Sequence, residues 1–235
     1  HVQALEVVLP SGEIAMLGGL DAEPAGLDLR GAFVGSEGTL GITTKIAVTI
    51  TPDAPAVKTL LLSFETVRDA ANTVSQIIAA GMVPAALEVM DQRITVAVEN
   101  YVNAGYPRDA GAVLLAEVDG LAESIEIDAE RIAQIGNDNN AIEVRTAADE
   151  TERAALWKGR KTAFGAVAQI APDYYLHDTV VPRSQLADVL EKIYAIADKY
   201  DLLVMHVYHA GDGNLHPLLV FDGRDEGILD RVHAA

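Results

Sequence analysis

The chain has no cysteine, and it is poor in basic and aromatic residues. Without cysteine, its 235 residues form no disulfide bond, use no thiolate in catalysis and ligate no iron–sulfur cluster. Only 17 Lys and Arg stand against 35 Asp and Glu, which gives a net charge of −18. We therefore expect no nucleic-acid partner, because phosphate contacts need clustered basic residues.

Long apolar runs are also missing. No stretch approaches the about 18 apolar residues of a membrane span, and no signal-peptide pattern opens the sequence. We expect no membrane span and a cytoplasmic location. What the sequence does have is 50% hydrophobic residues, enough for one large or two modest globular domains.

The pattern of strands and helices changes near residue 52. The first fifty residues read as short strands and turns, and the proline-containing segment 51–55 predicts a domain boundary. Beyond it strands alternate with helices, including helices expected at 87–101 and, as one long element, at 150–170. This alternation predicts an α+β domain with a ferredoxin-like, mostly antiparallel sheet and helices packed on one face.

Two histidines flank a predicted turn in His209-Ala-Gly-Asp-Gly-Asn-Leu-His216. Asp212-Gly213 is typical of a two-residue hairpin loop, which would set His209 directly opposite His216 with their Cβ atoms roughly 5 Å apart. This arrangement suits two nitrogen ligands on one divalent cation, which would need a further ligand, usually a carboxylate. The alternative is a hairpin whose paired histidines face solvent. His206 should point to the opposite face and be a packed or surface residue.

Two further motifs suggest ligand binding. Gly35-Ser-Glu-Gly-Thr-Leu-Gly41 has three glycines in seven positions, so its backbone can approach a flat or phosphorylated ligand, although an ordinary loop has the same composition. Trp157, Arg160, Lys161 and Phe164 share one helix face. The Arg160 guanidinium could hold a carboxylate through two parallel hydrogen bonds; a half-buried stripe with its charges in solvent is the alternative.

Together with Asp173-Tyr-Tyr175, these motifs resemble the FAD-linked oxidases that act on D-2-hydroxy acids, above all the glycolate oxidase flavoproteins. The resemblance implies oxidation of the hydroxy acid to the 2-oxo acid by hydride transfer to FAD. In the family that the chain resembles, members that oxidise longer dicarboxylates tend to carry a lysine in this strand. Its absence from residues 174–178 therefore favours a short substrate, glycolate or D-lactate. The resemblance also implies companion oxidase subunits as partners, and association with a membrane through these subunits.

The resemblance also assigns site residues. Arg160 is expected to hold the substrate carboxylate, with Lys161 second and Asn214 within reach of the site. His209 and His216 are expected to bind a divalent metal, zinc or manganese. The residues expected to line FAD are Glu37, Gly38, Thr39, Leu40, Gly41, Ile42 and Thr43.

By the same resemblance the chain should be incomplete. Residues 1–52 would be the C-terminal part of an FAD-binding domain, and 53–235 a truncated substrate-binding cap domain. The main flavin-binding region would precede His1, so we expect no bound FAD in this piece. A Gly-Glu-His-Gly stretch with the third metal ligand and the base would follow Ala235. The alternatives are a flavin-dependent alkyl transferase without redox chemistry, and a non-catalytic metal-binding or subunit-interaction module.

Overall fold

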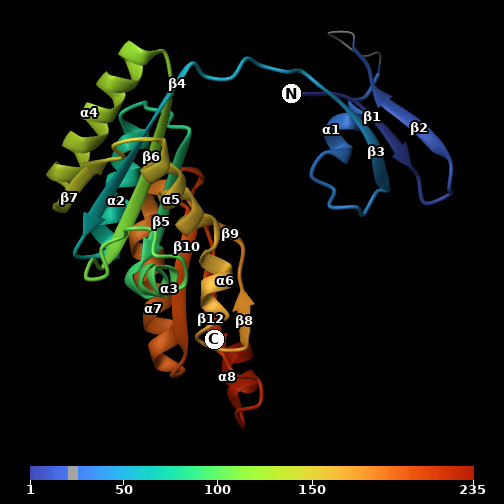
Figure 1. Cartoon of the computed structure of the whole chain (residues 1–235). Coiled ribbons are helices and arrows are strands. Elements are labelled where there is room, and N and C mark those ends of the chain that lie inside the picture. Colours follow the sequence, from blue (N-terminus) through green and yellow to red (C-terminus); the bar gives the residue numbers. More distant parts are fainter. Residues whose placement is uncertain (21–25) are drawn as a thin grey trace. The chain divides into compact units, whose positions relative to one another are not determined.

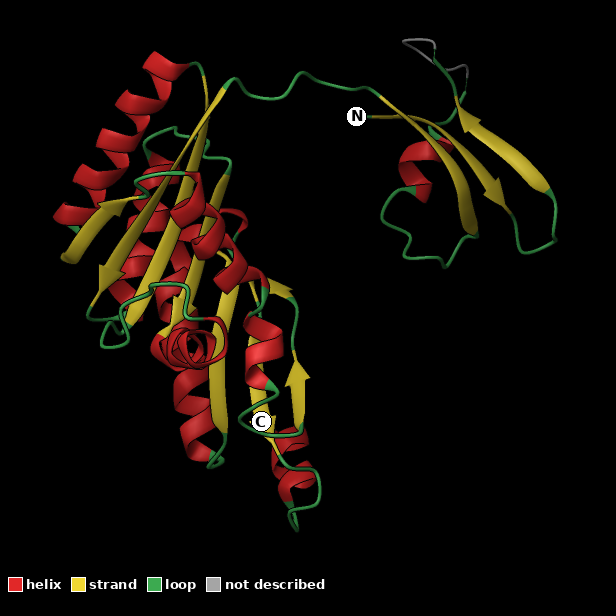
Figure 2. Ribbon diagram, viewed as in Figure 1, coloured by secondary structure: helices red, strands yellow, loops and turns green. Residues whose placement is uncertain are grey.

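A computed structural model describes residues 1–20 and 26–235 of the chain (Figures 1 and 2). The chain divides into two compact units, His1–Asp53 and Ala54–Ala235. Within the described residues, no helix combines the length and the apolar character needed to cross a bilayer.

The first unit is a three-stranded antiparallel sheet with one short helix. The sheet has the order β2-β1-β3, and its core is formed by Leu5, Val7 and Phe33. Asp28 caps the helix by accepting a hydrogen bond from the backbone N–H of Gly31. The elements are β1 (Val2–Val8), β2 (Ile14–Gly18), α1 (Leu29–Phe33) and β3 (Ile42–Val48).

The second unit is built on a seven-stranded sheet in the order β7-β4-β6-β5-β10-β12-β8, with antiparallel neighbours throughout. A separate two-stranded ribbon joins β11 to β9. The elements in chain order are β4 (Ala56–Phe64), α2 (Val67–Ala79), β5 (Ala86–Asp91), α3 (Gln92–Val102), β6 (Ala112–Gly120), α4 (Ala122–Asp138), β7 (Ala141–Thr146), α5 (Glu150–Lys161), α6 (Ala163–Val167), β8 (Asp173–Leu176), β9 (Thr179–Val180), the 3-10 turn η1 (Arg183–Gln185), α7 (Leu186–Lys199), β10 (Leu203–His209), the 3-10 turn η2 (Ala210–Asp212), β11 (Asn214–Leu215), β12 (Pro217–Phe221) and α8 (Ile228–Ala234).

The predicted α+β, antiparallel class is confirmed. Strands β4, β5, β6 and β7 with helices α2 and α4 follow the β-α-β-β-α-β order of a ferredoxin-like unit, with α3 inserted between β5 and β6. Strands β10, β12 and β8 then extend the same sheet beyond β5 (Figure 1).

Helices cover both faces of this sheet rather than the one face expected. On β4, Leu60 and Leu62 pack with α2, α4 and α7, whereas Leu61 packs with α3, α5 and α6. Because successive side chains of a strand point to opposite faces, these are two separate cores. The ferredoxin-like helices α2 and α4 do share one face; the other layer comes from the segments outside that motif.

Two predicted helices are wrong in detail. Residues 87–91 belong to strand β5, and the helix starts only after Asp91, whose carboxylate accepts from the N–H of Ile94. A short apolar run does not distinguish a strand from a helix by its spacing. The long helix expected at 150–170 breaks at Thr162, whose hydroxyl donates to the carbonyl of Lys158.

Candidate active site

The histidine segment joins strand β10 to β12, but not as a two-residue hairpin. The β10–β12 ladder ends at the pair His206 and Pro217, and the chain between them forms η2 and then β11, which pairs with β9. Gly213 has φ +75°, and a Cβ there would meet the carbonyl oxygen of Val181 at 2.3 Å, so only glycine fits this turn.

The loop nevertheless brings His209 and His216 together. Their ring centroids lie 5.1 Å apart and the rings are almost perpendicular, at 86°. In the described part of the chain, Nδ1 of His216 is buried without a hydrogen-bond partner. Burial lowers the pKa of His216, against the opposing effect of Asp178, so this imidazole is neutral at pH 7. A neutral imidazole is the form that binds a metal.

Glu88 of β5 connects this pair to Arg160 of α5. Its Oε1 lies 2.8 Å from Nδ1 of His209, and its Oε2 accepts from Nη2 and Nε of Arg160 at 2.7 and 3.0 Å. The Arg160 side chain is only 8% exposed and the Glu88 side chain 11%. The sequence does not reveal Glu88 as a site residue, because its pattern predicts a helix over 87–101. In the structure, the register of β5 with β10 sets Glu88 directly opposite His209.

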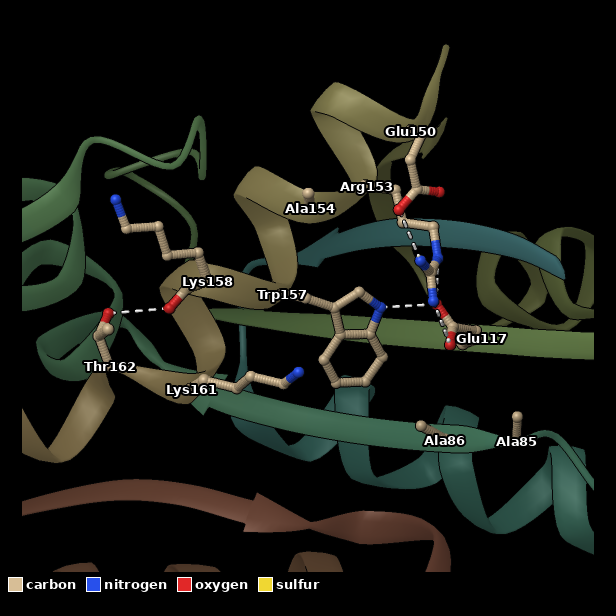
Figure 3. Close-up of a pocket in the computed structure, with 10 residues that line it drawn as sticks. All are labelled: Ala85, Ala86, Glu117, Glu150, Arg153, Ala154, Trp157, Lys158, Lys161 and Thr162. Carbon is tan, nitrogen blue, oxygen red and sulfur yellow. Dashed lines mark hydrogen bonds and ion pairs between the residues drawn. The ribbon is translucent and has the colours of Figure 1, made fainter.

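The predicted stripe of Trp157, Arg160, Lys161 and Phe164 divides into two groups. Arg160 turns inward to Glu88, and the Phe164 ring lies 6.4 Å from that of His216. Trp157 and Lys161 instead line a cavity of about 630 Å³ at the surface of α5, with the Lys161 ammonium 6.0 Å from the indole centroid (Figure 3).

Glu117 of β6 also lines that cavity and is the centre of a dense polar cluster. Its carboxylate accepts from Nε of Arg153 at 2.9 Å, from the indole N–H of Trp157 at 2.6 Å and from the hydroxyl of Thr59 at 2.5 Å. Figure 3 shows the indole nitrogen directed at Glu117. Burial alone would raise the pKa of Glu117, but these donors together hold it below its usual range.

Asn214 lies beside the histidine pair. Its amide donates to Asp178 at 2.7 Å, and Asp178 is 3.6 Å from Nε2 of His216. A second cavity, of about 340 Å³, is lined by Glu88 and His209 together with residues of the histidine loop. Within residues 1–20 and 26–235, no group of three His, Asp or Glu side chains forms a metal site.

The glycine-rich loop, residues 35–41, belongs to the first unit. Gly35 and Gly38 have φ +85° and +79°, and Glu37 also has positive φ, +50°. At Gly41, a Cβ would meet the carbonyl oxygen of Val8 at 2.5 Å. The glycines are therefore required by the backbone itself, and the expectation that residues 37–43 line a flavin stays a prediction.

His206 is packed in the core, which was one of the two alternatives for it. Its side chain is fully buried beside Tyr194, with ring centroids 4.8 Å apart. Burial lowers its pKa to about 3. Its backbone N–H donates to Asp91, which also accepts from the hydroxyl of Tyr194.

The same fold occurs in proteins of known structure. The chain resembles p-cresol methylhydroxylase, with a TM-score of 0.76 and 14% identity over 99% of this chain and 53% of that one. It also resembles 4-ethylphenol oxidase from Gulosibacter chungangensis, with a TM-score of 0.72 and 19% identity over 99% and 55% of the two chains.

Sequence comparison then gives the family. Residues 54–235 match the family described as FAD linked oxidases, C-terminal domain, and the chain belongs to that family. It is 45% identical to the glycolate oxidase subunit GlcD of Escherichia coli K12 over 97% of the chain and 46% of that protein. The GlcD of Bacillus subtilis is also 45% identical, over 100% and 50%, and a probable mitochondrial D-lactate dehydrogenase of Danio rerio is 33% identical, over 100% and 48%. The chain thus spans about half the length of these relatives.

Proposed function

We propose that this chain works in a flavin-dependent oxidoreductase that oxidises a short D-2-hydroxy acid, glycolate or D-lactate, to the 2-oxo acid. The observation that carries the proposal is the contact of Arg160 and His209 with one carboxylate, beside His216. The similarity to glycolate oxidase subunits and to a D-lactate dehydrogenase supports the choice of substrate. We assign unit His1–Asp53 to the end of the FAD-binding domain and Ala54–Ala235 to the substrate domain.

Arg160 would bind the substrate carboxylate. Glu88 uses Nε and one hydrogen of Nη2, so the Nη1 edge of the guanidinium keeps donors for a second carboxylate. In a chain with a net charge of −18, such a buried cation supplies the local attraction that the overall charge opposes. Lys161 is the second choice for this role, and Asn214 would position the hydroxyl side of the substrate.

His209 and His216 fit a divalent cation, zinc or manganese, as two imidazole nitrogen ligands, and further ligands would have to join them. Such an ion would lower the pKa of a bound hydroxyl, and FAD would supply the hydride acceptor. The residues proposed to line the flavin are those of the loop and of the start of β3, residues 37–43. We also propose that the protein has companion oxidase subunits, that it lies in the cytoplasm and that it attaches to a membrane through its partners.

The test is metal and substrate analysis of the whole protein. We expect stoichiometric zinc or manganese in the wild type, its loss in a His209→Ala, His216→Ala double variant, and bleaching of the flavin absorption by glycolate or D-lactate. A protein that holds flavin but is reduced by neither acid would contradict the substrate assignment. A metal content that is unchanged in the double variant would contradict the metal site.

A further inference from the structure

Glu88 contacts both Arg160, which is proposed to bind the substrate carboxylate, and His209, which is proposed to bind the metal. One of its oxygens faces Arg160 and the other faces His209, although these partners lie 72 and 121 residues away in sequence. The carboxylate comes from a central strand, between β6 and β10, so its backbone is held on both sides by ladder hydrogen bonds. A largely buried carboxylate on a central strand is well suited to hold two side chains in fixed positions.

The contact with His209 has a definite consequence for the imidazole. A carboxylate paired with a guanidinium only accepts hydrogen bonds, so Nδ1 of His209 must carry the proton in this contact. In the neutral ring the lone pair is then on Nε2, the atom available to a cation. Carboxylates behind metal-binding histidines act in this way, fixing the tautomer and the orientation of the ring.

The contact with Arg160 has a second consequence. Nε and Nη2 both donate to Oε2 of Glu88, which fixes the plane of the guanidinium and leaves its Nη1 edge free to turn to another anion. An arginine buried without an anion would carry a large desolvation cost, which this pairing offsets. One carboxylate therefore sets both the direction of the arginine and the tautomer of the histidine.

We propose that Glu88 is a shared positioning residue, which holds His209 in the Nδ1–H tautomer for a divalent cation and holds Arg160 in place for the substrate carboxylate. This inference rests on the proposed function. It adds a residue that makes no bond to the cation or the substrate and that couples their two binding groups.

The decisive variant is Glu88→Gln, which keeps the shape of the side chain. The amide oxygen would stay with Arg160, so the NH2 group would face Nδ1 of His209 as a donor and drive the proton to Nε2. We expect ¹⁵N NMR of the metal-free whole protein to show His209 as the Nδ1–H tautomer in the wild type and as the Nε2–H tautomer in the variant. We expect calorimetric titration to show Mn²⁺ affinity reduced about 10–100-fold.

The matched control is Glu117→Gln, on the neighbouring strand β6. Glu117 also accepts from an arginine, Arg153, but no histidine contacts it in the described structure. We expect this variant to keep both the His209 tautomer and the Mn²⁺ affinity of the wild type.

The outcomes separate this inference from the proposed function. A wild type that binds Mn²⁺ with His209 as the Nε2–H tautomer, or a Glu88→Gln variant with unchanged tautomer and affinity, would overturn the role of Glu88 and leave the oxidase assignment intact. A wild type that is reduced by glycolate but binds no Mn²⁺ or Zn²⁺ would remove the cation from the proposed function and the role of Glu88 with it. If Glu88→Gln does not fold, the wild-type tautomer alone decides.

Discussion

Two carboxylate–histidine pairs lie on the same two strands and behave in opposite ways. Glu88 and Asp91 are on β5, and His209 and His206 are on β10. Glu88 contacts the imidazole of His209, whose side chain is 48% exposed. Asp91 contacts His206 through its backbone N–H and not through its ring, which is fully buried. The two pairs are three positions apart on each strand, yet Glu88 and His209 belong to a candidate site whereas Asp91 and His206 have a structural role.

The difference shows why a buried ionisable residue is not by itself a functional one. Asp91 caps α3, accepts from Tyr194 of α7 and holds β10, so it ties three elements together. The imidazole nitrogens of His206 have no partner within the described residues, so its ring acts as a packed apolar group. In the other pair, Glu88 contacts Nε and Nη2 of Arg160 and Nδ1 of the half-exposed His209. The Nη1 group of Arg160 and Nε2 of His209 can then contact a ligand.

The largest expected effect is on the structural pair. Asp91→Ala leaves two buried donors and one partly buried donor without an acceptor and removes a helix cap, so we expect a loss of about 3–5 kcal/mol in the free energy of unfolding. His209→Ala, at a half-exposed position, should lose less than about 1 kcal/mol. Urea unfolding checks both values. Equal losses in the two variants would show that the two pairs contribute equally to stability, which would contradict the distinction drawn between them.

Metal affinity should show the reverse order. We expect His209→Ala and His216→Ala each to weaken Mn²⁺ binding more than about 100-fold, since losing a ligand costs more than losing an outer partner. His206→Leu, which fills the same core position, should bind Mn²⁺ as the wild type does. Calorimetric titration makes the comparison, and a weakened His206→Leu would show that the buried histidine belongs to the site.

The arginine of the candidate site can be tested against another arginine of the same helix. Arg160→Lys removes the planar fork, and losing one charge-assisted hydrogen bond, about 1.5–3 kcal/mol, should raise KM for glycolate about 10–100-fold. Arg153→Lys, in the comparable pair with Glu117, should leave KM within about twofold. Steady-state kinetics of the whole protein decides, and similar KM values for the two variants would argue against Arg160 as the carboxylate-binding residue.

The smallest expected effect is in the pH dependence of stability. The folded pKa of His206 is about 3 against an ordinary 6.5, so the unfolded chain alone binds its proton between these values and this residue lowers stability as the pH falls through that window. Burial raises the pKa of Asp91 to about 6 from 3.8, so its ionisation cost is relieved as the pH falls from about 6 to 3.8, and the two effects oppose each other.

We therefore expect His206→Leu to gain about 1–2 kcal/mol of unfolding free energy over the wild type on going from pH 7.5 to pH 5. Urea titrations at the two pH values measure this change. A difference between variant and wild type that is the same at both pH values would show that the folded chain protonates His206 as readily as the unfolded chain does.

The sequence predicted the antiparallel α+β class and the closeness of His209 and His216, because strand alternation and a turn-forming loop are local signals. It did not predict the actual turn, since β11 leaves the hairpin to pair with β9. It also missed Glu88, because the short run in β5 has no periodicity that excludes a helix, and its partners are far away in the sequence. Helices on both sheet faces were missed for a similar reason, since the choice of face is made by tertiary packing.

The most direct test of the candidate site is anomalous diffraction at the manganese edge from crystals of the whole protein grown with Mn²⁺ and glycolate. We predict one anomalous peak within about 2.3 Å of Nε2 of His209 and of one nitrogen of His216, with the glycolate carboxylate on the Nη1 edge of Arg160. A peak away from both histidines, or glycolate bound without contact to Arg160, would contradict the account.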